Sequence, residues 1–286
     1  MKFNKSLLSG SFILLISFNI FAVLNFIFQF SMARLLTIIE YGILATLFSI
    51  IYILSIFTES IQTILTKYSA GVLEEGKLKN LFLKSIKKTI SLSTLFFIAY
   101  AIISILLSKI LKIPYFVLIA IGLFVFIAFT IAVSRGIMQG KKMFASLGFN
   151  MVLESTVKLI LAVLLVLAGW KIYGAIVGIL IGGATALIIS LFPLRKILRE
   201  KEGKADTDRI YNYAGPVFFI TLIIVIFYSI DIIIARIFLS EELVGYYAIA
   251  SILAKAILLL FHFYNVLMPK IAPPSILQKC QRSQMA

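Results

Sequence analysis

Ionisable and amide side chains recur at helical spacing inside strongly apolar stretches of this sequence. One stretch carries Asn150, Glu154 and Lys158, each four residues after the last, and another carries Glu59 and Gln62. Residues three or four apart lie on one face of an α-helix, so each set forms a polar stripe. A polar stripe on an apolar helix predicts that this face meets a neighbouring helix or a water-filled cavity.

The chemistry that these groups offer is binding. Lysine ammonium groups attract phosphate, amides bind sugar hydroxyls, and carboxylates take up a proton or a cation. The candidates for lining such a cavity are Asn25, Gln29, Glu59, Gln62, Asn150, Glu154, Lys158, Asp231 and Lys255. A structural alternative is open, because Glu154 and Lys158 have the spacing of an ion pair along one helix face. Asp231 is likewise open to pairing or capping within a helix bundle.

The sequence offers little for metal chemistry. It contains one cysteine, Cys280, and one histidine, His262. A single cysteine excludes a disulfide within the chain and a cysteine-based metal site, and a single histidine leaves no histidine cluster for zinc or iron. We expect no metal and no cofactor, while H⁺ or Na⁺ would be the candidate coupling ion.

The elements that must position these residues are long and apolar. Of the 286 residues, 62% are hydrophobic and the mean hydropathy is +1.09, whereas soluble domains are about 45–50% apolar. Runs of about 20 apolar residues cross a bilayer, and runs this long satisfy their backbone there as helices. We predict an all-α polytopic membrane protein with about eight spans, at residues 11–33, 41–66, 90–108, 115–134, 147–169, 173–194, 211–238 and 244–268.

The net charge of +15 reflects basic residues placed in short clusters between the apolar runs. With the N-terminus inside, 20 Lys and Arg residues fall in inner segments and five in outer loops. This bias predicts a multi-pass protein of the cytoplasmic membrane with both termini in the cytoplasm. The placement favours membrane lipids as the partner of the positive charge and argues against nucleic acid.

The polar connections between the predicted spans are short. The two longest are residues 67–89 and 195–210, and neither can fold into a catalytic domain. We therefore expect no enzymatic activity. A membrane enzyme such as a lipid-linked glycosyltransferase is disfavoured, because it needs a substantial loop outside the membrane.

A short stretch of the sequence occurs twice. "ARLLTIIEYG" begins at Ala33 and "ARIFLSEELVG" begins at Ala235, and the step from arginine to glycine is 8 residues in the first and 9 in the second. The copies are separated by six predicted spans, so both run in the same direction, as in a parallel repeat.

The repeat predicts four segments: a six-helix lobe (1–194), a charged cytoplasmic linker (195–210), the first two helices of a second lobe (211–270), and a polar tail (271–286). We expect a C-terminally truncated chain with an aberrant tail, and the alternative is an ordinary disordered tail.

These residues resemble the polysaccharide-transporter branch of the multidrug/oligosaccharidyl-lipid/polysaccharide exporter superfamily, the flippases of lipid-linked oligosaccharides. The likeness rests on "MARLLTIIEYGILATL", "SRGIMQGKKMF", which looks like the loop between spans four and five, and "SIDIIIARIFLSEELVGYYAIA". The family-motif positions are Arg34, Gly42, Arg135, Gly136, Gln139, Gly140 and Gly245. The resemblance implies two six-helix lobes around a central cavity, whereas this sequence has about eight spans.

The resemblance implies a transporter that flips or exports lipid-linked oligosaccharide or polysaccharide precursors across the cytoplasmic membrane by alternating access. The implied partners are that substrate, membrane lipids and polysaccharide assembly proteins. Two alternatives stay open: a cation-coupled multidrug exporter of the same superfamily, and an inactive truncated fragment.

Two further expectations concern helix surfaces. Arg34 and Arg236 lie at outer helix ends, where we expect their long side chains to reach lipid headgroups. A series of small residues at every fourth position predicts close helix packing; it comprises Gly174, Gly178, Gly182 and Ala186.

Overall fold

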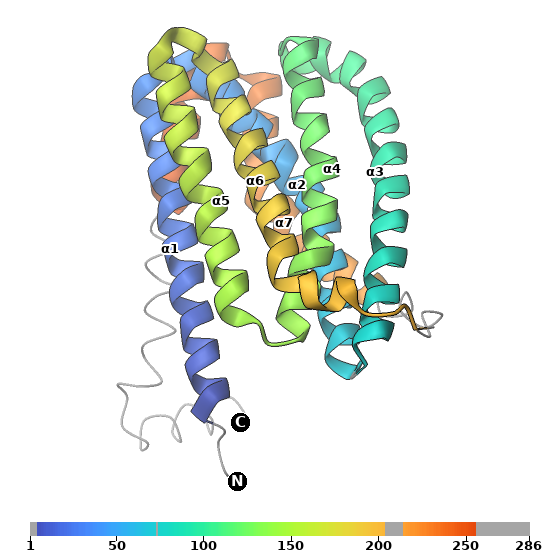
Figure 1. Ribbon diagram of the computed structural model, residues 1–286. Coiled ribbons are helices and arrows are strands. Elements are labelled where there is room, and N and C mark those ends of the chain that lie inside the picture. The colour runs from blue at the N-terminus through green and yellow to red at the C-terminus, as the bar shows by residue number, and fades with distance from the viewer. Residues whose placement is uncertain (1–4, 73, 204–213, 256–286) are drawn as a thin grey trace, which may run out of the picture.

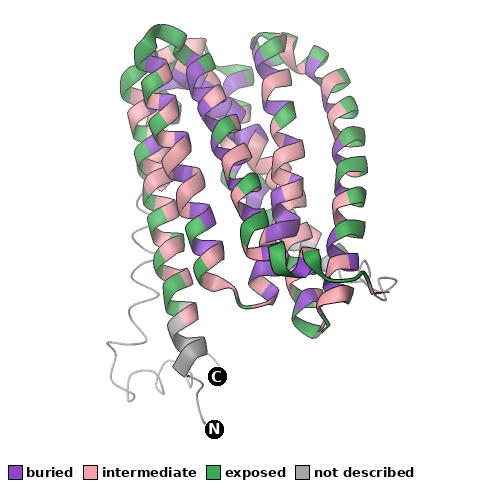
Figure 2. Cartoon of the chain, viewed as in Figure 1, coloured by how far each residue is buried: buried purple, intermediate pink, exposed green. Residues whose placement is uncertain are grey.

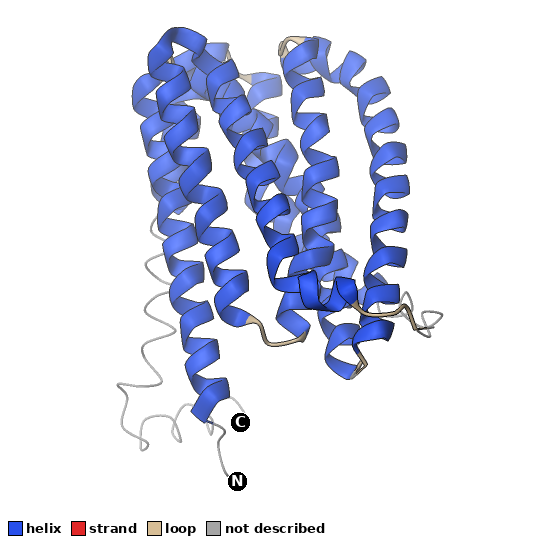
Figure 3. Cartoon of the chain, in the orientation of Figure 1, coloured by secondary structure: helices blue, strands red, loops and turns tan. Residues whose placement is uncertain are grey.

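The computed structural model describes residues 5–72, 74–203 and 214–255, and its regular elements are helices (Figures 1 and 3). They are α1 (Lys5–Leu35), α2 (Ile38–Gly71), α3 (Glu75–Leu111), α4 (Tyr115–Gly140), α5 (Phe144–Leu165), α6 (Lys171–Arg199) and α7 (Ala214–Phe238), with a π-helical turn at Val166–Trp170. A further helix, called here the 241–255 helix, begins at residue 241 and is described as far as residue 255. The prediction of an all-α protein is confirmed for the described residues.

Six stretches of the described chain are long and apolar enough to cross a membrane. One of them, Phe144–Arg199, is 56 residues long but reverses direction at the π-helical turn, so that α5 and α6 lie side by side (Figure 1). Gly169 has a φ of 91° in this turn, a conformation that glycine adopts without a steric cost. The chain is therefore a multi-pass membrane protein. The count of eight spans stays a prediction, because residues 256–286 lie outside the described residues.

The helices continue beyond the predicted spans, and two predicted boundaries are wrong. The predicted connection 67–89 is mostly helical, because α2 ends at Gly71 and α3 begins at Glu75. The motif predicted for the loop between spans four and five lies largely inside α4, which ends at Gly140. Hydropathy marks the part of a helix that lies in lipid, whereas polar residues can continue the same helix into the interface.

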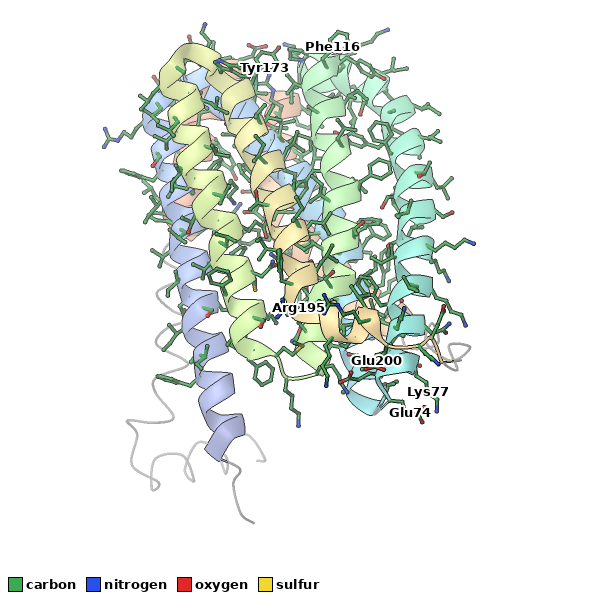
Figure 4. All side chains as sticks on the ribbon, viewed as in Figure 1. Glu74, Lys77, Phe116, Tyr173, Arg195 and Glu200 are labelled. Carbon is green, nitrogen blue, oxygen red and sulfur yellow. The ribbon has the colours of Figure 1, made fainter. Side chains whose placement is uncertain are left out.

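The turns divide the molecule into two ends, named as they appear in Figure 1. The upper end holds the turns after α1, α3, α5 and α7, and the lower end holds those after α2 and α4. Figure 4 shows exposed aromatic side chains at the upper end, Phe116 and Tyr173. It shows charged side chains at the lower end: Glu74, Lys77, Arg195 and Glu200.

The helices do not pack in sequence order. α1 packs mainly on α5 and hardly contacts α2, while α2 lies between α4 and α7, and α6 lies against α4 and α5. Figure 2 shows buried residues concentrated on α2, α4 and α6, with more exposed residues along α3. The helices α1 to α6 form one bundle, here the first bundle, and α7 with the 241–255 helix forms a second pair beside α2.

The predicted small-residue series joins α6 to α5. A Cβ atom added at Gly178 would lie 2.7 Å from the Ala162 Cβ, and one added at Gly182 would lie 2.8 Å from the Lys158 Cβ. Real side chains essentially never approach this closely, so glycine is needed for the two backbones to come together. The expectation of close helix packing is confirmed at these glycines.

Two buried apolar clusters form the core. The upper cluster takes in Ile232 of α7 and Ala248 of the 241–255 helix, together with residues of the first bundle such as Leu44 and Leu118. The lower cluster is built around Leu78, and its buried members within the described ranges come from α2 to α6. Among the described residues, the second pair thus contributes buried side chains to the upper cluster and none to the lower one.

Candidate functional site

A cavity of about 280 Å³ lies where the second pair meets α1 and α2. Three of the predicted candidates line it: Asn25 and Gln29 from α1, and Lys255 from the 241–255 helix. The remaining walls are mostly aromatic or small, and the aromatic members are Phe21, Phe26, Tyr41, Phe48, Tyr52 and Tyr228. An apolar, aromatic cavity with a few polar groups is the usual form of a small-molecule site.

The second pair contributes a charged wall. The Lys255 ammonium lies 3.7 Å from Asp231 Oδ1 on α7 and 4.5 Å from the centre of the Tyr228 ring. Ser251 and Tyr247 donate their hydroxyl groups to Asp231 Oδ2 at 3.2 and 3.3 Å. Asp231 does not line the cavity itself and positions Lys255, whose side chain remains one-fifth exposed.

The first bundle contributes an amide wall supported by a buried lysine. Lys158 on α5 donates a hydrogen bond to Asn25 Oδ1, and its ammonium lies 5.0 Å from the centre of the Phe28 ring. Lys158 is itself buried and does not line the cavity. It therefore acts on the cavity through Asn25, whose position it fixes.

The ion pair considered between Glu154 and Lys158 does not form, and Glu154 pairs with Arg135 of α4 instead. Arg135 Nη2 lies 2.5 Å from Glu154 Oε2, and Arg135 Nε donates to Asn150 Oδ1 at 2.9 Å. Asn150 in turn donates to the carbonyl oxygen of Ala186 on α6 at 2.7 Å. These residues join α4, α5 and α6 in a largely buried polar network, in which each charge has a partner.

Gln62 lies at a contact between α2 and α4, away from the cavity lining. It donates to Gln139 Oε1 at 2.9 Å. Gly136 and Gly140 flank this contact, since a Cβ at Gly136 would lie 2.8 Å from the Gln62 carbonyl oxygen and one at Gly140 would overlap Ser69 Oγ. These motif glycines allow α4 to approach α2.

Glu59 is exposed on α2 and does not line the cavity. A role in cation uptake for this residue stays a prediction. His262, Cys280 and the predicted tail 271–286 lie outside the described residues.

Sequence reasoning missed the tyrosines of the cavity. Tyr41 is almost fully buried and lines the cavity, and its hydroxyl oxygen has no hydrogen-bond partner among the described residues. Tyr52 and Tyr228 form an edge-to-face ring pair with centres 5.5 Å apart. In an apolar helix a tyrosine is indistinguishable from ordinary core, so only the unpartnered hydroxyl marks Tyr41 as available to a ligand.

The two copies of the repeated stretch contact each other at the upper end. A Cβ added at Gly42 would lie 3.0 Å from the backbone nitrogen of Gly245, and one added at Gly245 would overlap the carbonyl oxygen of Ile38. Arg34 is exposed, in keeping with the expectation, but the expectation for Arg236 is wrong. Arg236 is buried and donates hydrogen bonds to the carbonyl oxygens that end α3.

A solved structure resembles this chain in fold, and a family model matches it in sequence. A solved structure described as "protein A" aligns with a TM-score of 0.71 and 15% sequence identity, over 90% of this chain and 62% of that chain. The chain thus spans less than two thirds of that structure's length. No curated protein matches it. The model of the family described as "Polysaccharide biosynthesis protein" matches residues 7–273, and the chain belongs to this polysaccharide biosynthesis family, as the motifs indicated.

Proposed function

We propose that this protein moves lipid-linked oligosaccharide or polysaccharide precursors across the cytoplasmic membrane by alternating access. The observation that carries the proposal is the cavity of about 280 Å³ between the first bundle and the second pair, in a chain of this family. Transport of this kind makes and breaks no covalent bond, so we assign no enzymatic activity.

The cavity walls suit a saccharide joined to phosphate. The amides of Asn25 and Gln29 and the unpartnered Tyr41 hydroxyl offer hydrogen bonds to sugar hydroxyls. The tyrosine and phenylalanine rings offer flat apolar surfaces to the carbon faces of a sugar. Lys255 is the positive group of the lining, and it attracts the phosphate groups of a lipid carrier.

The proposed orientation places the lower end in the cytoplasm. The bias of Lys and Arg toward the inner segments supports it, and the exposed aromatic residues of the upper end suit the opposite interface. Both termini would then be cytoplasmic.

We propose that the second pair begins a second, parallel lobe within a set of eight spans. The packing of Gly42 on Gly245 supports this reading, because equivalent positions of the two copies meet. Polysaccharide assembly proteins are the proposed partners, and Asp231 is the proposed site for a coupling H⁺ or Na⁺.

A cation-coupled multidrug exporter is the second candidate. The aromatic lining favours it, because aromatic faces bind organic cations. The lysine beside Asp231 weighs against it, because an ammonium group already occupies the position that a cationic drug would take.

The test uses cells that lack their own polysaccharide exporter and express this chain. We expect the chain to restore surface polysaccharide, and we expect Lys255→Gln and Asn25→Ala each to lower it about tenfold, the loss that corresponds to ~1.4 kcal/mol of binding. The precursor should accumulate inside at unchanged protein level. Lys109→Gln, which removes an exposed lysine at the end of α3, is the matched control and should export normally.

Two outcomes would contradict the assignment. Normal export by Lys255→Gln at normal protein level would remove the cavity from the mechanism. Drug resistance conferred by the chain, with no change in surface polysaccharide, would favour the multidrug exporter.

A further inference from the structure

The cavity begins directly below the crossing of the two repeated stretches. Its lining starts at Tyr41 on α2 and at Ala248 on the 241–255 helix, next to the glycine pair Gly42 and Gly245. On α2 the lining continues to Tyr52, a distance of about 16 Å at 1.5 Å per residue. The glycine crossing is therefore the upper limit of the cavity.

The crossing is tight because both helices present backbone there. The position that a Cβ would take at Gly245 is filled by Ile38, and the position at Gly42 is 3.0 Å from the Gly245 nitrogen and 3.2 Å from its Cα. Two helix backbones in direct contact leave no room for a solute between them. Passage from the cavity to the upper end thus requires the 241–255 helix and α2 to separate.

Arg236 holds the second pair against the first bundle at the same end. Its Nε donates to the Leu111 carbonyl oxygen at 2.7 Å, and its Nη2 donates to the Lys112 carbonyl oxygen at 3.1 Å. Its side chain is 1% exposed and lies 3.9 Å from Glu241 Oε1. These carbonyls end α3, where the helix dipole favours a positive charge. The contact therefore pairs two of the three guanidinium nitrogens with the end of α3, while Nη1 has no hydrogen-bond partner among the described residues.

The second pair contacts the first bundle differently at the lower end. The buried members of the lower apolar cluster come from α2 to α6 within the described ranges, whereas the upper cluster includes residues of the second pair. In addition, α1 and α2 make few contacts with each other, one of which is the ring pair of Phe28 and Phe48. Toward the lower end, the described part of α7 meets the first bundle through the ring of Phe218, whose centre lies 5.2 Å from that of Phe57 on α2.

We propose that the Gly42–Gly245 crossing and the Arg236 contact form a gate at the upper end of the cavity, and that this structure has the gate closed. Opening separates the 241–255 helix from α2 and releases Arg236 from the α3 carbonyls. The inference rests on the proposed function, since a gate has meaning for a transport cavity.

The test measures access to the cavity from each side of the membrane. The single cysteine is removed by Cys280→Ser, and Ser49→Cys places a reporter in the cavity, where Ser49 is buried. Leu35→Cys, at an exposed position of the upper end, shows which side of right-side-out and inverted vesicles carries that end. The rate of modification by a membrane-impermeant maleimide is then measured from each side.

We expect Gly245→Ala to raise the reaction rate of the reporter from the upper side about tenfold or more, because an added Cβ favours the separated state. Arg236→Gln should act in the same direction by removing hydrogen bonds without adding bulk. If Gly245→Ala does not accumulate, the milder Gly42→Ala gives the same measurement. Gly178→Ala, whose added Cβ is more crowded than that of Gly42→Ala but lies between α5 and α6, is the matched control and should leave the upper-side rate unchanged.

Unchanged upper-side rates in folded Gly42→Ala or Gly245→Ala and in Arg236→Gln would overturn the gate. An equal rise from both sides, or the same rise in Gly178→Ala, would overturn it as well, because it would indicate general loosening. The readout is chemical labelling, so it stands apart from export. If the labelling rates contradicted the gate, the effect of Lys255→Gln on export would still stand. If the chain failed to export, the labelling rates would still test the gate.

Discussion

The two copies of the repeated stretch agree in how the second helix of each pair begins. α2 follows the N-cap residue Thr37 and carries Gly42 five residues later. The 241–255 helix follows Ser240 and carries Gly245 five residues later. The copies therefore match when they are aligned from the cap, and the extra residue of the second copy lies between the arginine and the cap.

The copies differ in where the arginine goes. Arg34 is exposed, with its guanidinium 5.4 Å from the centre of the Phe30 ring, whereas Arg236 is buried against the end of α3. One extra residue in a helix turns a side chain by about 100° relative to the cap and the helix after it. A one-residue change in a repeat can therefore convert an exposed arginine into a contact between the second pair and the first bundle.

The largest expected effect is a difference in the free energy of unfolding between variants of the two arginines. Arg236→Ala should lower the free energy of unfolding in detergent by about 3 kcal/mol, because it leaves the buried carbonyls of α3 without their charged donor. Arg34→Ala should change it by less than about 0.5 kcal/mol, as is usual for exposed positions. Denaturant titration of both variants measures the difference. Equal losses would show that the burial of Arg236 has no energetic consequence, and the contrast between the copies would fail.

The glycines should show the next largest difference. Gly245→Ala should lower the free energy of unfolding by about 1–3 kcal/mol, the usual cost of overpacking. Gly42→Ala should cost less, because its Cβ would meet the Gly245 nitrogen at 3.0 Å, whereas a Cβ at Gly245 would lie 2.2 Å from the Ile38 carbonyl oxygen. Gly71→Ala, with nothing within 4 Å of the added atom, is the control. A larger loss at Gly42 than at Gly245 would contradict the packing of the glycine crossing.

The sequence predicts which helices exist better than it predicts where each helix begins and ends. Long apolar runs predicted the helices α1 to α7, because lipid leaves a run of that length few other structures. The predicted connection 67–89 was wrong because lysines near a helix end keep their charge in the interface while the backbone stays helical. Hydropathy detects the long apolar runs, but it does not detect a helix that continues through polar residues outside the lipid.

The site was predicted in part, for a similar reason. Periodicity identified polar faces, and three candidates from those faces line the cavity: Asn25, Gln29 and Lys255. The same reasoning could not say which neighbour a face meets. Asn150 and Glu154 meet Arg135 of the preceding helix, and Gln62 meets Gln139 across the contact between α2 and α4. A polar face therefore predicts a partner within the bundle, and the tertiary arrangement decides whether that partner is protein or substrate.

The smallest expected effect concerns the two N-caps. Thr37 forms a full capping box with Glu40, with bonds of 3.1 and 3.3 Å, whereas Ser240 accepts a single 3.5 Å bond from the Leu243 nitrogen. Thr37→Ala should therefore cost about 1 kcal/mol, and Ser240→Ala only a few tenths. Leu243→Glu supplies the missing reciprocal side chain at an exposed position and should recover part of the difference. If this variant gains nothing in a denaturant titration, then the turn after α7 is set by Arg236 rather than by its cap, and the copies differ in what fixes the helix start.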